Sequence, residues 1–358
     1  MASFGGAQPL VDVDLFEPLV VPASQLLLFY TALVSVDYLL LRNEPRLPIT
    51  GIPLRFVLGI VHAFIPLAII SPYAPYNLFF ATCPWFIVSY TAALPTWRLS
   101  YRKYLTAFYA VILDVSDEER LQLAQGRSEN FGGSAALDPV GTRVRGLLKI
   151  GLGIGKWVLV TRYVDPLLPE KYSVIFSYAW LDPRSLALTL LLGIKAYLML
   201  GVTDIGCGIE QVILGVRMVD LFHSPIISSS PMEFWSRRWN RAVRNLLHGL
   251  IFLSSSKMDA RSRNWRGLLV FFISGVFHEL IIMSCCRKMT LENLLFFTLH
   301  GVAVLVQVTV RVATGSKGSP QGVMRVFCIA CHLLFMTLTG RLFLAPFIRY
   351  NFLGIIAT

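Results

Sequence analysis

Long apolar stretches recur along the chain, and most are about as long as a helix that crosses a lipid bilayer. Crossing the hydrocarbon takes roughly 17–25 consecutive apolar residues. We expect about eight such helices, over residues 24–41, 52–71, 76–95, 146–164, 186–203, 267–285, 291–310 and 326–345. The fourth is the weakest because Lys149 and Lys156 interrupt it. The sequence therefore predicts an all-α integral membrane protein, with residues 1–358 forming a single transmembrane domain.

The overall composition agrees with a lipid environment. Of the 358 residues, 55% are hydrophobic and only 15% are charged, whereas soluble domains carry about 25% charged residues. The net charge of +11 would suit nucleic acid, but the basic residues gather between the apolar stretches. We therefore assign them to cytoplasmic loops and anionic lipid headgroups, and we expect no nucleic-acid partner.

The placement of basic residues also predicts an orientation. No Lys or Arg precedes Arg42, which excludes a secretory signal peptide, whereas residues 204–266 hold nine. We expect a luminal N-terminus and an endoplasmic reticulum location, with residues 96–145, 204–266 and 311–325 in the cytoplasm. Arg287 and Lys288 lie in a loop predicted to be luminal and therefore do not fit this pattern.

Two stretches outside the spans, and the cysteines, have no strong signal. Residues 104–113 are apolar but too short to span, so we expect an interfacial or re-entrant segment. Residues 114–141 are polar, with Gly-Gly and Asp-Pro breakers, and predict a surface loop or short helix. Cys328 and Cys331 have metal-ligand spacing but no partner pair. We expect inert thiols and no metal site.

A basic, tryptophan-rich segment stands out in the second half of the chain. In SSSPMEFWSRRWNR, residues 228–241, Ser230 can cap a helix that begins at Pro231. From Trp235 onward, apolar residues recur with helical spacing, and a basic face carries Arg237, Arg241, Arg244 and His248. We expect one continuous amphipathic helix in the membrane interface. Its basic face either anchors to headgroups or receives an anionic substrate.

An ionisable pair lies in the middle of the apolar span 267–285. His278 adjoins Glu279, and Ser274 is four residues before His278 on the same helical face. Intramembrane ionisable residues are costly, which by default indicates function. Other polar residues also fall within spans, and a lone histidine there is usually a packing residue; these are Asp37, His62, Lys195, His300 and His332.

These two segments together resemble a known family. LFHSPIISSSPMEFWSRRWN followed by FFISGVFHELII resembles the wax-synthase-like branch of the membrane-bound O-acyltransferases. Phe234, Trp239 and Asn240 match the F-Y-x-D-W-W-N motif of related sterol and diacylglycerol acyltransferases, while Trp235 replaces its Tyr. Arg237 and Arg238 replace its Asp and first Trp. LHGV at 299–302 and TGRLFLAPFIR at 339–349 extend the resemblance over about residues 200–350.

The resemblance implies acyl transfer from acyl-CoA, as co-substrate, to the hydroxyl of a lipophilic alcohol, without a bound cofactor. It places the family histidine at His278, as general base, and the family asparagine at Asn240, as oxyanion donor or thioester-positioning group. We expect further substrate contacts from Trp235, Arg237, Arg238, Trp239, Ser274 and Glu279. Arg237 and Arg238 would hold the CoA phosphates, and Arg241 and Arg244 would meet headgroups.

Several alternatives stay open at this point. The acyl group ranges from acetyl to long-chain, and the acceptor is a fatty alcohol or a terpenoid-type natural product. A different class of protein, a transporter or channel, would use Asp37, Lys195, His278 and Glu279 as a polar pathway. A non-catalytic membrane scaffold is a third option. Neither internal repeats nor paired broken helices, both common in transporters, are recognisable. The oligomeric state stays open.

Overall fold

The computed structural model describes residues 8–91, 96–124, 133–136, 138–251, 260–315 and 318–352. Within them the chain is almost entirely helical, with four two-residue strands. The principal helices are α1 Ala23–Arg42, α2 Gly51–Ala68, α3 Ala74–Thr91, α4 Tyr101–Tyr109, α5 Asp117–Ala124, α6 Pro139–Leu159, α7 Pro183–Met199, α8 Gly201–Leu214, α9 Pro231–Glu233, α10 Arg241–Ile251, α11 Ala260–Cys286, α12 Glu292–Ala313 and α13 Gly322–Arg349. The strands are β1 Val13–Asp14, β2 Leu19–Val20, β3 Ile69–Ile70 and β4 Lys288–Met289.

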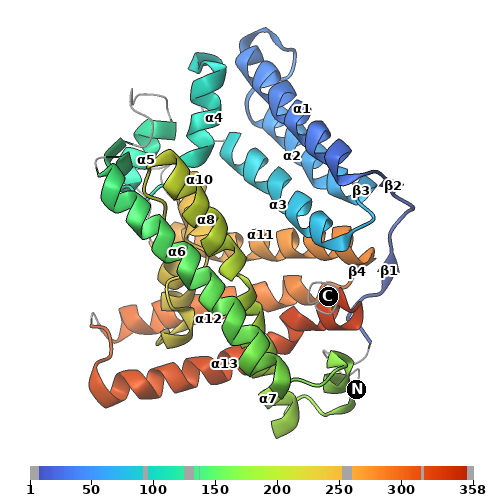
Figure 1. The fold of residues 1–358 in the computed structure, drawn as a ribbon, viewed down its shortest axis with the longest axis vertical. Coiled ribbons are helices and arrows are strands. Elements are labelled where there is room, and N and C mark those ends of the chain that lie inside the picture. The colour runs from blue at the N-terminus through green and yellow to red at the C-terminus, as the bar shows by residue number, and fades with distance from the viewer. Residues whose placement is uncertain are drawn as a thin grey trace.

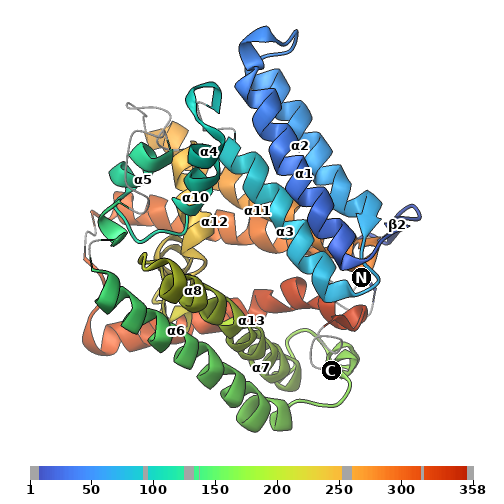
Figure 2. The same cartoon turned by 45° about the horizontal axis from the view of Figure 1, so that its top comes forward.

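Three groups of helices make up the molecule. Helices α1, α2 and α3, the first three in the chain, lie side by side, while α11, α12 and α13 run across the molecule (Figure 1). Helices α6, α7 and α8 form the third group, which a turned view places beside α13 (Figure 2). The groups meet where α3 packs on α11 and where α7 packs on α13. The central helices α11, α12 and α13 therefore have neighbours from both other groups.

Glycines bring α6 and α8 into backbone contact. A Cβ atom on Gly153 would lie 2.5 Å from the carbonyl oxygen of Gly201, and one on Gly208 would lie 2.7 Å from that of Gly146. Small residues at such positions let helices approach closely in a membrane. A buried ion pair between Lys156 and Asp204 joins the same two helices. Lys156, one of the two lysines that interrupt the predicted fourth span, is thus neutralised inside the helix pair.

Small residues also set the spacing of the central helices. A Cβ atom on Gly275 of α11 would lie 3.0 Å from the Cα atom of Leu294 on α12. About two helical turns after Leu294 on α12, a Cβ atom on Gly301 would lie 2.8 Å from the Cβ atom of Phe271 on α11. Larger side chains at these two positions would push the helices apart. The close crossing fixes the part of α11 that carries His278.

Short strand pairs tie the N-terminal segment to distant parts of the chain. β1 pairs antiparallel with β4, in a register that places Val13 opposite Met289. β2 pairs in parallel with β3, with Leu19 opposite Ile69. The Lys288 ammonium lies 3.0 Å from Asp12 and 2.7 Å from Asp14. These two carboxylates neutralise Lys288, whose loop is predicted to be luminal although it carries basic residues.

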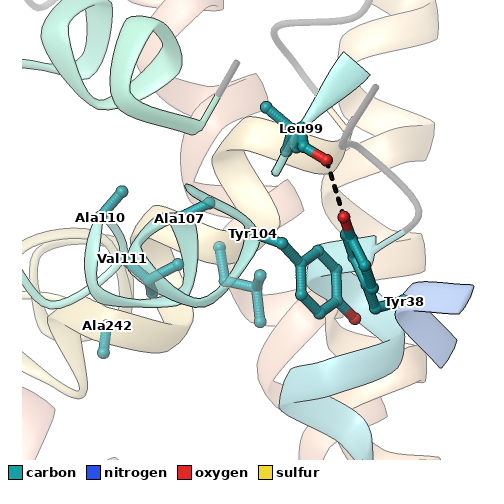
Figure 3. Packing of buried hydrophobic residues seen from close by; sticks show 8 residues of the cluster. Tyr38, Leu99, Tyr104, Ala107, Ala110, Val111 and Ala242 are labelled. Atoms are coloured by element: carbon teal, nitrogen blue, oxygen red, sulfur yellow. Dashed lines mark hydrogen bonds between the residues drawn. The ribbon is translucent and has the colours of Figure 1, made fainter. Parts of the chain in front are cut away.

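The short helices α4 and α10 share a hydrophobic cluster with α1. Tyr104 and Ala107 of α4 pack with Ala242 of α10 and with Tyr38 of α1, whose hydroxyl donates to the carbonyl of Leu99 (Figure 3). Tyr104 is fully buried in this cluster. The predicted interfacial or re-entrant segment is therefore a short helix covered by other helices. The polar stretch after it contains the short helix α5, as expected.

The all-α membrane fold is confirmed, but the number of eight spans is not. Among the described residues, five helical stretches are long and apolar enough to cross a bilayer: Ala23–Arg42, Pro183–Leu214, Asn264–Cys286, Glu292–Ala313 and Gly322–Arg349. The second joins α7 and α8, so residues 204–214 are helical and not part of a loop. That part of the predicted 204–266 loop was wrong because α8 is apolar and packs against α6.

Candidate active site

The tryptophan-rich segment begins as a capped helix but does not continue as one. The Ser230 hydroxyl accepts a hydrogen bond from the Glu233 N–H at 3.2 Å, as the capping pattern predicts. After α9, residues Phe234–Arg238 form a π-helical turn, and helix α10 starts only at Arg241. The expected continuous amphipathic helix was therefore wrong. We call residues 230–240 the motif turn.

Backbone pairing with an earlier segment breaks the helix. The Trp239 N–H closes the π turn on the carbonyl of Phe234 at 2.8 Å. The carbonyl of Arg238 then accepts from the N–H of His223, and the N–H of Arg241 donates to Leu221. Between them, Asn240 adopts a left-handed conformation with φ of 42°, which Asn tolerates better than most residues. The basic residues before and after Asn240 consequently do not share one helical face.

The Asn240 side chain serves this break directly. Its Oδ1 atom accepts a hydrogen bond from the N–H of Val243 at 3.2 Å, and so caps the first turn of α10. Asn240 does not line either of the cavities described below. Asn240 therefore fixes the end of the motif turn, and its contact with substrate stays a prediction.

The Arg238 side chain makes hydrogen bonds within the protein. Its Nε atom donates to the Glu233 carboxylate at 2.7 Å, and its guanidinium also donates to the carbonyl of His223 at 3.2 Å. Partial burial would raise the pKa of Glu233, but hydrogen bonds from Ser229 and from Arg238 outweigh it and hold that pKa at about 2. Arg238 therefore braces the motif turn, and its contact with phosphate stays a prediction.

An apolar cavity of about 160 Å³ lies between the motif turn and helices α7, α11, α12 and α13. Trp235, Trp239 and His278 all line it, so the structure brings these three predicted site residues together. No Asp, Glu, Lys or Arg is among its described lining residues. We call it the apolar cavity. It offers a lipophilic molecule a place beside a single predicted general base.

The hydrogen bonding of His278 defines which ring nitrogen is free. Its Nδ1 atom lies 2.8 Å from the carbonyl oxygen of Ser274, and a carbonyl can only accept. Nδ1 must therefore carry the proton, which leaves the lone pair on Nε2. The His278 ring also packs 4.2 Å, centroid to centroid, from that of Phe297. Ser274 thus acts on the imidazole through its backbone rather than through its hydroxyl.

A chain of hydrogen bonds holds Trp235. Its indole Nε1–H donates to Nδ1 of His300 at 3.1 Å. Since Nδ1 accepts, Nε2 of His300 carries the proton and donates to the Thr339 hydroxyl at 3.0 Å. That hydroxyl donates in turn to the carbonyl of Phe335. His300 is therefore a fully paired packing residue, as expected for most histidines in the spans.

Glu279 is not among the lining residues of the apolar cavity, and its carboxylate holds a loop. Its Oε1 atom accepts hydrogen bonds from the N–H and the hydroxyl of Thr290 and from the N–H of Leu291. These donors belong to the loop before α12, so Glu279 fixes that loop. Neighbouring residues on a helix point about 100° apart. The adjacency of Glu279 to His278 in sequence therefore does not place both at one site.

A second, polar cavity of about 580 Å³ adjoins the outer side of the motif turn. Glu233, Arg237 and Arg311 are its charged lining residues, and serines contribute further polar groups. Arg237 makes no hydrogen bond or ion pair with the described residues, whereas Arg311 donates to the carbonyl of Gly318. We call this the polar cavity. It presents two guanidinium groups at the place where the sequence predicts an anionic substrate.

The motif turn separates the two cavities. Met232 and Glu233 line the polar cavity, and the next two residues, Phe234 and Trp235, line the apolar cavity. Arg311 lines the polar cavity but was not predicted as a site residue, because it falls at the start of the predicted cytoplasmic loop 311–325. His332 lines the apolar cavity, although it was predicted to be a packing residue.

In the described part of the chain, no three His, Cys, Asp or Glu side chains are placed to hold a metal ion. The cysteines whose side chains are described are free thiols: Cys207, Cys285, Cys286, Cys328 and Cys331.

Comparison with known protein families supports the resemblance seen in the sequence. Residues 218–299, which contain the motif turn and His278, match the Membrane bound O-acyl transferase family. The predicted resemblance to that superfamily, and to its wax-synthase-like branch, is confirmed by this match and by curated relatives.

The relatives that the chain matches carry closely similar names. "Probable long-chain-alcohol O-fatty-acyltransferase 1" of Arabidopsis thaliana is 28% identical over 205 residues, which are 55% of this chain and 58% of that protein. "Long-chain-alcohol O-fatty-acyltransferase" of Simmondsia chinensis is 29% identical over 116 residues, 30% of this chain and 33% of that protein. In both cases the chain matches less than two thirds of the relative's length.

Proposed function

We propose that this protein transfers an acyl group from acyl-CoA to the hydroxyl of a lipophilic alcohol and so forms an ester. The observation that carries the proposal is the position of His278 in an apolar cavity, beside the two tryptophans of the motif turn. The relatives' names, which specify long-chain alcohols and fatty acyl transfer, support the same class of substrates.

His278 would act as the general base. Its Nε2 lone pair accepts the hydroxyl proton while the alcohol oxygen attacks the thioester carbonyl. The new C–O bond forms, the C–S bond breaks, and the proton passes to the departing CoA thiolate. Such help from a positioned base contributes typically 10²–10⁴-fold to the rate. The hydrogen bond from Nδ1 to Ser274 keeps the base in the required tautomer.

The polar cavity would receive the phosphates of acyl-CoA. Arg237 and Arg311 supply the positive charge there, and guanidinium groups pair well with phosphate oxygens. The Glu233 carboxylate in the same cavity is paired with Arg238, which reduces its repulsion of an anion. We assign Arg237 to phosphate binding and Arg238 to bracing the motif turn.

The apolar cavity would hold the reacting groups away from water, which limits hydrolysis of the thioester. Trp235 and Trp239 provide its wall on the side of the motif turn. Asn240 would act by positioning this wall, because it ends the motif turn and caps α10. The acyl group ranges from acetyl to long-chain, and the acceptor is a fatty alcohol or terpenoid-type alcohol.

We further propose that the protein is a multi-pass component of the endoplasmic reticulum membrane, with the polar cavity facing the cytoplasm. The basic residues of 204–266 and 311–325 support that orientation. It would expose the CoA site to the compartment in which acyl-CoA is made.

The decisive experiment is an incubation of the purified protein with radiolabelled acyl-CoAs and a panel of alcohols. We expect a labelled ester whose formation needs both substrates. Ester formation with none of the acyl-CoAs would refute the proposed activity. The panel would also establish the acyl length and the acceptor class.

A further inference from the structure

His332 of α13 is a buried histidine whose ring nitrogens make no hydrogen bond to the described residues. Its side chain is 3% exposed, yet neither Nδ1 nor Nε2 has a hydrogen-bond partner among the described residues. It lines the apolar cavity. His300, which is 0% exposed, uses both of its ring nitrogens. Two histidines in the same region thus have opposite hydrogen-bonding states.

An unpaired imidazole is a poor choice for packing alone. Buried polar groups are nearly always hydrogen-bonded, and one left without a partner costs free energy compared with an apolar side chain of similar size. A phenylalanine in place of His332 would fill similar space without that cost. Among the described residues, the His332 imidazole therefore makes no hydrogen bond that an apolar ring would lose, and this unused hydrogen-bonding capacity points to a partner that is not among them.

The location of His332 narrows the identity of that partner. Cys328, one turn earlier on α13, lines the polar cavity, while His332 lines the apolar cavity. The His332 ring lies 5.5 Å, centroid to centroid, from that of Phe234, the first residue of the motif turn to face the apolar side. His332 therefore stands at the junction of the two cavities.

The positions of His332 and Phe343 along α13 give the separation between this junction and His278. Phe343, whose ring lies 5.8 Å from that of His278, follows His332 by eleven residues. At 1.5 Å per residue, that separation corresponds to about 16 Å along the helix axis. His332 is thus one end of a path along α13, and His278 is close to the other end.

We propose that His332 hydrogen-bonds an amide of the pantetheine arm of acyl-CoA where the arm passes from the polar to the apolar cavity. This inference rests on the proposed function, which places the phosphates in the polar cavity and the thioester at His278. The arm joins those two parts of the donor and carries amide groups. A neutral imidazole offers one N–H donor and one lone pair, which match an amide carbonyl and an amide N–H. An acyl chain offers neither.

The test compares His332→Phe, which removes the hydrogen bonds, with His332→Gln, which keeps a donor and an acceptor. His300→Phe is the matched structural variant because it leaves the indole N–H of Trp235 without its partner. Each protein is assayed in detergent for thermal unfolding, for KM of acyl-CoA and of the alcohol, and for Kd of two ligands. One is a non-reactive thioether analogue of acyl-CoA, and the other is 3′,5′-adenosine diphosphate, which lacks the arm.

A lost hydrogen bond weakens binding by roughly two- to tenfold. We expect His332→Phe to raise KM for acyl-CoA and Kd of the thioether analogue by that factor. His332→Gln should stay closer to the wild-type values. The KM for the alcohol and the Kd of the nucleotide should not change. Thermal stability should be unchanged or higher in His332→Phe and lower in His300→Phe.

Three results would overturn the inference while leaving the proposed function standing. These are an unchanged Kd of the analogue in His332→Phe, a rise in KM for the alcohol in place of acyl-CoA, or a loss of stability as large as in His300→Phe. If the wild-type protein neither binds the analogue nor transfers acyl groups, the proposed function falls and this inference falls with it.

Discussion

Replacing His278 with Gln is the sharpest test of the chemistry. Gln occupies comparable space and stays polar, but it cannot accept the hydroxyl proton. We expect kcat to fall by roughly 10²–10⁴-fold, the usual contribution of a general base, which corresponds to about 2.7–5.5 kcal/mol in the activation barrier. The KM for acyl-CoA should change little, because the arginines proposed to bind phosphate line a different cavity.

The fold should survive this substitution. The hydrogen bond from His278 to the Ser274 carbonyl has a net value of about 0.5–1.5 kcal/mol, which is small beside a typical folding free energy of about 5–15 kcal/mol. The assay is initial-rate ester formation in detergent, with thermal unfolding measured on the same sample. An intact His278→Gln protein that forms ester at near the wild-type rate would refute the assignment of His278 as the base.

Three other predictions use matched variants or positions. Arg237→Gln should raise KM for acyl-CoA about tenfold or more, as expected for a charge-assisted pair, and added salt should weaken acyl-CoA binding by the wild type similarly. Arg244→Gln should change KM for acyl-CoA little, and the reverse ranking of the two variants would contradict the assignment of Arg237. Gly275→Ala should lower stability by about 1–3 kcal/mol through overpacking. Gly267→Ala should not lower it, because a Cβ atom there would meet nothing within 4 Å. Thermal unfolding of the two variants checks this difference. An engineered glycosylation site within 252–262, of which 252–259 lie outside the described residues, should stay unmodified; a glycan there would reverse the proposed orientation.

The parts of the structure set by local sequence were predictable. Apolar length located the long central helices α11, α12 and α13, since a spanning segment leaves a signal about twenty residues long, but it missed most of α8. His278 was recognisable as a candidate, because an ionisable residue in an apolar span needs a specific reason, and it does line the apolar cavity. Ser230 was correctly predicted as a cap, since that interaction joins residues only three apart.

The parts set by distant contacts were not predictable in the same way. Residues 235–250 have helical periodicity, yet backbone pairing with Leu221 and His223 interrupts them. Arg238 and Glu279 stand beside site residues in sequence, but their hydrogen bonds direct them into the protein. Nothing in the spacing of residues 221–241 encodes that pairing. The existence of the motif was therefore readable from the sequence, and the division of its side chains between two cavities was not.

The β1–β4 pair has a consequence for the synthesis of the protein. Asp12 and Lys288, which form an ion pair beside these strands, are 276 residues apart. Residues 11–15 therefore leave the ribosome long before their partners exist. Unpaired backbone groups are not stable in hydrocarbon, so this stretch must wait in water on the side where the loop after α11 will emerge. Its pairing is thus among the last steps of assembly, and it marks a chain in which α11 has already been inserted.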